Sequence, residues 1–176
     1  MICGWFNNII NNVYLIQENI YTIRMKIIEY NKWEIEYDDY LTQKVYKSLT
    51  SGPEDCVCEN CKNFLLARED FYPEDFKKVL NQLGVDSKKE VEITWFNRIK
   101  PGWHLYSGWF HFVGNILKIP QFGYKTIYEQ APEFKNFAWD FSVRKHLISS
   151  AFEQNPVVQL EWIGLVSWVI DLPEPS

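Results

Sequence analysis

Hydrophobic and polar residues alternate along much of the chain with a period of two, which is typical of half-buried strands. Two five-residue segments, 26–30 and 33–37, flank Asn31-Lys32, and the second of them alternates strictly. This pattern predicts a β-hairpin with a two-residue turn and one face in water. Period two returns later, and we expect strands at 91–95, 103–113, 137–143 and 158–162. Gly108 is expected to form a bulge in the second of these.

A helical spacing of three and four residues occupies the region between the hairpin and the later strands. Asp38-Asp39 offers an N-cap to a first helix, a second leaves the cysteine-rich segment near Cys61, and a third opens at Pro73 and ends at Gly84. This segregation predicts an α+β fold, with a mostly antiparallel sheet and helices from residues 38–83 packed on one face.

The first 24 residues differ in composition from the rest of the chain. They contain five of the 13 asparagines of the chain. They end just before Met25, which is the only methionine besides Met1. We therefore expect residues 1–24 to be a non-native N-terminal extension, residues 25–172 to form a single domain, and residues 173–176 to be a tail. Repeated asparagines interrupt the apolar run, and no Lys or Arg precedes Arg24, so neither a signal peptide nor a membrane span is predicted.

Composition narrows the function classes. The net charge of -5 disfavours a nucleic-acid or anionic-membrane partner, and 47% apolar residues indicate a folded protein. Four cysteines in 176 residues are too few for a disulfide scaffold. We expect a cytoplasmic protein whose partner is an unidentified protein or small molecule.

Three cysteines within six residues form the strongest chemical signal, Cys56-Val57-Cys58-Glu59-Asn60-Cys61. A C-x-x-C step lets two thiolates reach one tetrahedral ion, and the C-x-C step adds a third, which makes zinc the favoured metal. A helix beginning near Cys61 would place its positive end beside the thiols and favour their ionisation. The neighbouring acidic residues oppose this shift.

The fourth ligand is left open by the sequence. His104, His111 and His146 are candidates. In one regular strand His104 and His111 point to opposite faces, so one ion cannot bind both. Cys3 is available only if the N-terminal segment is native. The alternative interpretation is three reduced, inert thiols without metal, and thiol-redox chemistry is a third.

Catalytic motifs for hydrolases, metalloproteases and nucleotide-binding proteins are absent from the sequence. His111 lies between Gly108 and Gly114 and is either a ligand or base facing a pocket, or a histidine hydrogen-bonded in an aromatic core. Asp140 and Glu161 occupy the polar phase of their strands and are expected to face solvent. The tryptophans in the apolar phase are expected in the core: Trp33, Trp95, Trp139 and Trp162.

Several short motifs, taken together, carry a resemblance. They are Cys56-x-Cys58-x-x-Cys61-x-Asn63-Phe64, Phe71-Tyr72-Pro73, Leu83-Gly84-Val85-Asp86, Gly108-Trp109-Phe110-His111-Phe112-Val113-Gly114, Val158-Gln159-Leu160-Glu161-Trp162 and Trp168-Val169-Ile170-Asp171 before Pro173-Glu174-Pro175. From Met25 to Pro175 the chain resembles a family of small bacterial proteins, common in Firmicutes, that has no established activity. The resemblance implies a bacterial cytosolic protein that begins near Met25, and it assigns no mechanism.

Two functional hypotheses follow. The first is a non-catalytic binding or interaction domain whose cysteine loop is ordered by zinc. The second is an enzyme or thiol-redox protein that uses Cys56 to Cys61, with His111 as a further participant.

Overall fold

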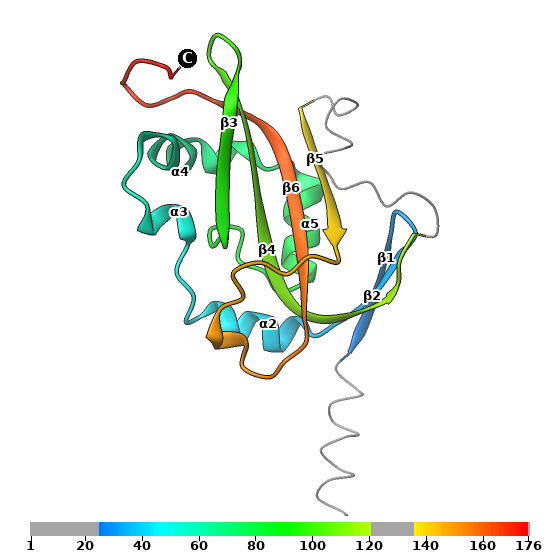
Figure 1. The fold of residues 1–176 in the computed structure, drawn as a ribbon. Helices are drawn as coiled ribbons and strands as arrows, with labels where there is room; N and C mark the ends of the chain where they lie inside the picture. Colours follow the sequence, from blue (N-terminus) through cyan, green and yellow to red (C-terminus); the bar gives the residue numbers. More distant parts are fainter. Residues whose placement is uncertain (1–24, 121–135, 176) are drawn as a thin grey trace, which may run out of the picture.

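The computed structural model describes residues 25–120 and 136–175, which form an antiparallel sheet with helices (Figure 1). The elements are β1 (Lys26–Tyr30), β2 (Trp33–Tyr37), α2 (Asp39–Tyr46), α3 (Gly52–Asp55), α4 (Glu59–Phe71), α5 (Glu74–Gln82), β3 (Glu92–Lys100), β4 (Trp103–Lys118), β5 (Phe137–Ser142), the 3-10 helix η2 (Ser150–Phe152) and β6 (Val157–Ser167). The strand order is β1-β2-β4-β6-β5, and β3 also pairs with β4. The predicted α+β class is confirmed.

The N-terminal hairpin forms as the sequence predicts. Asn31 and Lys32 both have positive φ angles, of 46° and 69°, as the two central residues of a type I′ turn require. The N-cap of α2 is also as expected, since the Asp38 side chain accepts a hydrogen bond from the backbone N–H of Leu41 at 2.8 Å. The predicted N-terminal extension and the segment 121–135 lie outside the described residues.

Strand β4 is the longest element of the sheet and organises it. It pairs with β6 in one unbroken register from Trp103–Ser167 to Val113–Val157. Gly108 is therefore not a bulge. The register shifts along β4 lie elsewhere, at Trp95/Asn97 and Arg98/Lys100 of β3 and at Glu34/Ile35 of β2. A Cβ atom at Gly108 would come within 2.6 Å of the Trp162 ring, so glycine is needed there because an aromatic side chain packs directly on the backbone.

Helices α4 and α5 cover one face of the sheet (Figure 1). Aromatic side chains from these helices and from the sheet pack together in the core. Phe64 of α4 stacks on Trp162, with ring centroids 5.5 Å apart, and Phe76 of α5 contacts Trp139. Of the four tryptophans expected in the core, Trp33 and Trp162 are fully buried, whereas Trp95 and Trp139 are partly buried against it.

The opposite face of the sheet departs from the prediction. Asp140 and Glu161, expected to face solvent, are only 7% and 2% exposed, and they lie opposite each other on β5 and β6. The connection between β5 and β6 accounts for part of this burial: it crosses this face, with the backbone N–H of His146 bonded to Gln159 and Phe152 packed on His111. A strand pattern cannot reveal that a later loop covers its polar side.

Within residues 25–120 and 136–175, no helix has both the length and the apolar character that crossing a membrane requires.

Candidate metal centre

The three sequence-predicted thiols meet at the start of α4. Their Sγ atoms all lie within 4.8 Å of one another, and those of Cys56 and Cys58 are 3.3 Å apart. Cys58 is the N-cap of α4, and its sulfur accepts a hydrogen bond from the backbone N–H of Cys61 at 3.4 Å. The C-x-C step occupies the connection between α3 and α4, and the C-x-x-C step is the first turn of the helix.

This separation matches the needs of a tetrahedral metal. With zinc–sulfur bonds of about 2.3 Å, the sulfur atoms of a tetrahedral site lie about 3.8 Å apart, which falls within the spread of this cluster. Small side-chain rotations are then sufficient to bring the three sulfurs onto one ion. The cluster can therefore hold a thiophilic metal, with three ligands from one loop.

The three thiols differ in exposure and acidity. Cys58 is exposed, Cys56 is half-buried and Cys61 is buried. Hydrogen bonds from the backbone and thiol of Cys58, and from the thiol of Cys61, lower the pKa of Cys56. Burial, reinforced by the other two thiols, raises the pKa of Cys61 well above the usual range. Cys56 therefore ionises before Cys61, and Cys61 ionises most easily when a cation compensates its charge.

None of the three histidines considered as a fourth ligand joins the cluster formed by the described residues. Nδ1 of His104 accepts a hydrogen bond from the Trp95 ring at 3.0 Å, while Nε2 lies 3.6 Å from a Glu174 carboxylate oxygen. His111 is seven residues from His104 in β4, so the alternation of the strand places it on the other face, as predicted. There its Nε2 lies 3.1 Å from Gln159. Cys3 lies outside the described residues. Among residues 25–120 and 136–175, no fourth ligand joins the three sulfurs.

The start of α4 is anchored from the sheet. The Tyr106 hydroxyl donates to the carbonyl of Asn60 at 3.1 Å. The Asn63 side chain, fully buried, donates to the Ser167 carbonyl and accepts from the backbone N–H of Val169. These bonds hold the first turn of the helix, and with it Cys61, in a fixed position relative to β4 and β6.

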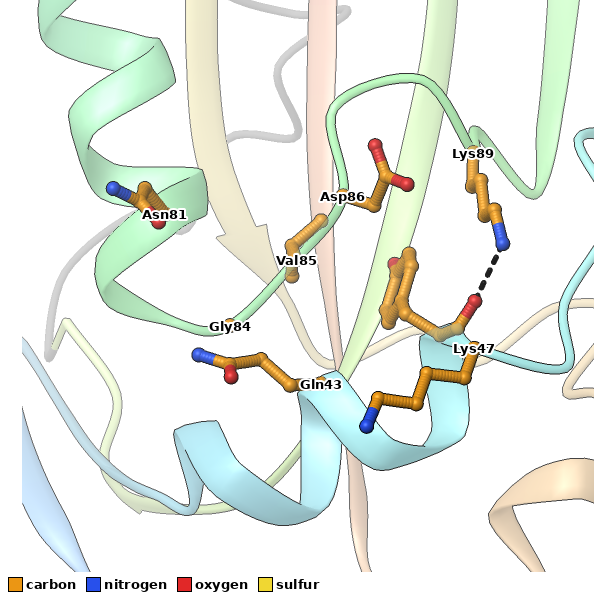
Figure 2. Close-up of a pocket in the computed structure, with 8 residues that line it drawn as sticks. Gln43, Lys47, Asn81, Gly84, Val85, Asp86 and Lys89 are labelled. Carbon is orange, nitrogen blue, oxygen red and sulfur yellow. Dashed lines mark hydrogen bonds between the residues drawn. The ribbon is translucent and has the colours of Figure 1, made fainter.

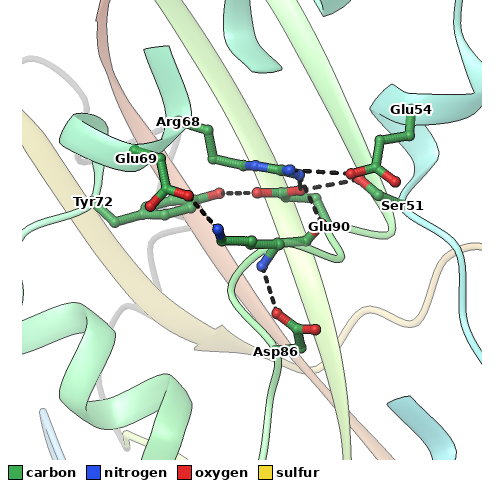
Figure 3. A network of polar contacts seen from close by, with 8 residues as sticks. Ser51, Glu54, Arg68, Glu69, Tyr72, Asp86 and Glu90 are labelled. Atoms are coloured by element: carbon green, nitrogen blue, oxygen red, sulfur yellow. Dashed lines mark hydrogen bonds and ion pairs between the residues drawn. The ribbon is translucent and has the colours of Figure 1, made fainter. Parts of the chain in front are cut away.

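A polar network centred on the buried Glu90 joins α3, α4 and the approach to β3 (Figure 3), and no local sequence pattern indicated it. The carboxylate of Glu90 accepts from Arg68 at 3.0 Å, from Tyr72 at 2.9 Å and from Ser51 at 3.2 Å. Arg68 also pairs with Glu54 of α3. Because these residues come from α3, α4 and the strand approach to β3, the network fixes the two ends of the cysteine loop.

Two cavities lie on either side of Lys89, whose ammonium donates to the Tyr46 carbonyl at 2.6 Å. The larger, of about 480 Å³, is open and is bordered by Gln43, Asn81 and Asp86 (Figure 2). The smaller, of about 240 Å³, is bordered by residues from α3, β4 and the β5–β6 connection, including His111. Neither cavity is bordered by Cys56, Cys58 or Cys61, so both are separate from the thiol cluster.

No family model, curated protein or solved structure matches this chain.

Proposed function

We propose that the protein is a non-catalytic interaction domain whose cysteine loop is ordered by Zn²⁺, with Cys56, Cys58 and Cys61 as ligands. The observation that carries this proposal is the convergence of three sulfur atoms within 4.8 Å at a helix N-terminus. Zinc neutralises thiolates that would otherwise repel one another beside the acidic residues Glu54 and Glu59. The resemblance to a bacterial cytosolic family supports a compartment in which thiols remain reduced.

The exposed part of the loop gives this domain a surface for a protein partner. Val57 lies between two of the ligands and is 83% exposed. An apolar side chain held rigidly at the surface loses little conformational entropy when a partner buries it. The fourth coordination position is then filled by water or by a ligand atom of the partner.

A thiol-redox protein is the second candidate, favoured by the 3.3 Å separation of the Cys56 and Cys58 sulfurs and by the lowered pKa of Cys56. In this reaction Cys56 thiolate attacks an acceptor disulfide, one acceptor sulfur leaves as a thiolate, and Cys58 then displaces the second. The domain gains one disulfide, and the acceptor is reduced to two thiols.

Metal analysis of the full chain, purified without a histidine tag, separates the two functions. The zinc proposal expects one zinc per chain, protection of three thiols from titration, and loss of zinc in Cys58→Ser and Cys61→Ser. Cys3→Ser is the matched control and should retain the metal. Full zinc content in Cys58→Ser would refute this ligand set. A metal-free protein that oxidises reversibly at Cys56 and Cys58 would instead establish the redox function.

A further inference from the structure

The segment that follows β6, residues 168–175, contains no helix or strand. At its start the backbone N–H of Trp168 donates to the Gly102 carbonyl at 3.0 Å, which continues the pairing of β6 with β4. The Trp168 ring then donates to the Leu172 carbonyl at 2.9 Å and closes a loop within the segment. In Figure 1 the segment, drawn in red, ends beside the β3–β4 hairpin. Its position depends on side chains of other elements.

One end of the segment is attached to α4 through Asn63, which is fully buried. The side-chain oxygen of Asn63 accepts from the backbone N–H groups of Val169 and Ile170, at 2.7 and 3.2 Å. The side-chain nitrogen donates to the Ser167 carbonyl at 3.0 Å. These partners fix the orientation of the amide, because a backbone N–H only donates and a carbonyl only accepts. A single side chain of α4 thus satisfies three backbone groups where β6 ends and the segment begins.

The other end is attached to the β3–β4 turn through Glu174. Both carboxylate oxygens accept from the backbone N–H of Gly102 at 3.1 Å, and one lies 3.5 Å from the Arg98 guanidinium. The carboxylate also lies 3.6 Å from Nε2 of His104. Since the Trp95 ring can only donate to Nδ1 of His104, the neutral imidazole carries its proton on Nε2. The segment is therefore fixed at two points, one on α4 and one on the turn.

The attachment on α4 lies two residues after a thiol of the cluster. Cys61 is in the first turn of α4, and its backbone N–H is bonded to the sulfur of Cys58, which caps the helix. The N–H groups of a first turn have no partners within the helix, and helix ends fray. A metal bound to both sulfurs ties the cap to the first turn and opposes this fraying. Asn63 keeps its hydrogen bonds only while this part of α4 is formed.

We propose that the metal state of the thiol cluster controls the docking of residues 168–175, which form a latch that is closed when metal is bound and opens when it is lost. This inference rests on the proposed zinc site. The converging thiols and the docked segment belong to one conformation, so a ligand that favours this conformation favours both. The coupling is reciprocal, because docking of the segment must raise the affinity for zinc by the factor by which zinc favours docking. Opening frees the donors of Gly102 and Arg98 that the Glu174 carboxylate occupies.

The test measures amide hydrogen exchange in the full chain with equimolar Zn²⁺ and after removal of zinc by a chelator. The amides of Val169 and Ile170 should exchange at least about fivefold faster without zinc, which is the lower end of common coupling factors. The amide of Ile28 in β1 is the internal control and should exchange at the same rate in both samples.

The reciprocal effect is measured as zinc affinity, by competition with a chromophoric chelator. Asn63→Ala removes the attachment on α4 and should weaken zinc binding by a similar factor of at least about five. Asn115→Ala is the matched control, because Asn115 of β4 bonds to Glu36 of β2 and not to α4. It should bind zinc as the wild type does.

Glu174→Ala separates the latch from a local effect on α4, since Glu174 bonds to the β3–β4 turn. It should accelerate exchange at Val169 and Ile170 and weaken zinc binding. The latch is overturned, with the zinc site left standing, if the chain binds one zinc and exchange at Val169 and Ile170 does not change. Unchanged zinc affinity in a folded Asn63→Ala protein overturns it as well, as does unchanged affinity in Glu174→Ala should Asn63→Ala prove unfolded. A chain that binds no zinc refutes the proposed function itself, and the latch with it.

Discussion

Arg68 of α4 lies 3.0 Å from the carboxylate of Glu90, and this carboxylate has no contact with solvent. Burial raises the pKa of Glu90, and the positive charge of Arg68 is the largest opposing influence. Arg68 therefore offsets part of the cost of burying this carboxylate at the point where α3, α4 and the approach to β3 meet. Its loss would release both ends of the cysteine loop.

Replacing the arginine should be strongly destabilising. In Arg68→Leu, Glu90 keeps only its neutral donors, and breaking a buried ion pair on one side costs about 3–5 kcal/mol. Chemical denaturation of the wild type and variant at pH 7 measures this loss. Glu69→Gln is the control, because the exposed Glu69–Lys88 pair should leave the unfolding midpoint nearly unchanged.

The same variant should show a defined pH dependence. A carboxyl whose pKa is higher in the folded than in the unfolded protein stabilises the fold most when it is protonated. Its contribution to the free energy of unfolding therefore falls as the pH rises through the folded pKa. Removing Arg68 raises the pKa of Glu90 further, since an opposing charge is lost. The destabilisation by Arg68→Leu should thus be smaller at pH 4 than at pH 7. An equal loss at both pH values would contradict an ionised Glu90.

The Arg68–Glu90 pair also shows which features of the fold local sequence patterns do not predict. The hairpin, the helix caps and the thiol cluster depend on neighbouring residues, so local spacing was sufficient to predict them. Arg68 and Glu90 are 22 positions apart and appear in the sequence as ordinary charged residues. Only the packing of α4 beside the approach to β3 brings them together, and no local period encodes that packing.

The thiols should react in a defined order in metal-free protein. The pKa of Cys56 is lowered and that of Cys61 is raised, and Cys61 is also buried. Because the thiolate is the reactive form, iodoacetamide at pH 7.5 should modify Cys56 at least tenfold faster than Cys61. Timed quenching and peptide mass mapping give the two rates. Faster labelling of Cys61 would show that the loop has a different arrangement.

Gly108 should tolerate no side chain, for a steric reason. A Cβ atom there would lie 2.6 Å from the Trp162 ring and 2.7 Å from the Glu92 carbonyl, so Gly108→Ala should cost about 1–3 kcal/mol or more by overpacking. Gly102→Ala is the comparison. Its Cβ meets no atom within 4 Å, but its φ is +78°, so only the backbone penalty of about 1 kcal/mol applies. Thermal unfolding should rank Gly108→Ala as clearly the less stable variant.

The polar face of the sheet was predicted in its alternation but not in its environment. Asp140, Gln159 and Glu161 follow the period of two, and this period places them correctly on the side away from α4 and α5. Whether such a face meets water depends on the course of the β5–β6 connection. The hydrogen bond of His111 depends on that connection as well. The backbone N–H of His146 fixes the Gln159 amide oxygen, which accepts the proton of His111 Nε2.

His111 should make the stability of the protein depend on pH below neutrality. Burial lowers the pKa of His111 to about 4, whereas an unfolded histidine titrates near 6.5. Between these values the unfolded chain binds more protons than the folded one, so stability falls as the pH is lowered through this window. The full contribution is present above pH 6.5 and amounts to roughly 3 kcal/mol.

Urea denaturation of the wild type and His111→Gln from pH 4 to pH 7.5 isolates the contribution of His111, because other groups titrate in both proteins. The difference between the two free energies of unfolding should change by this amount across the window. A pH-independent difference would mean that His111 is protonated in the folded state as readily as in the unfolded one, which is incompatible with a neutral ring donating through Nε2.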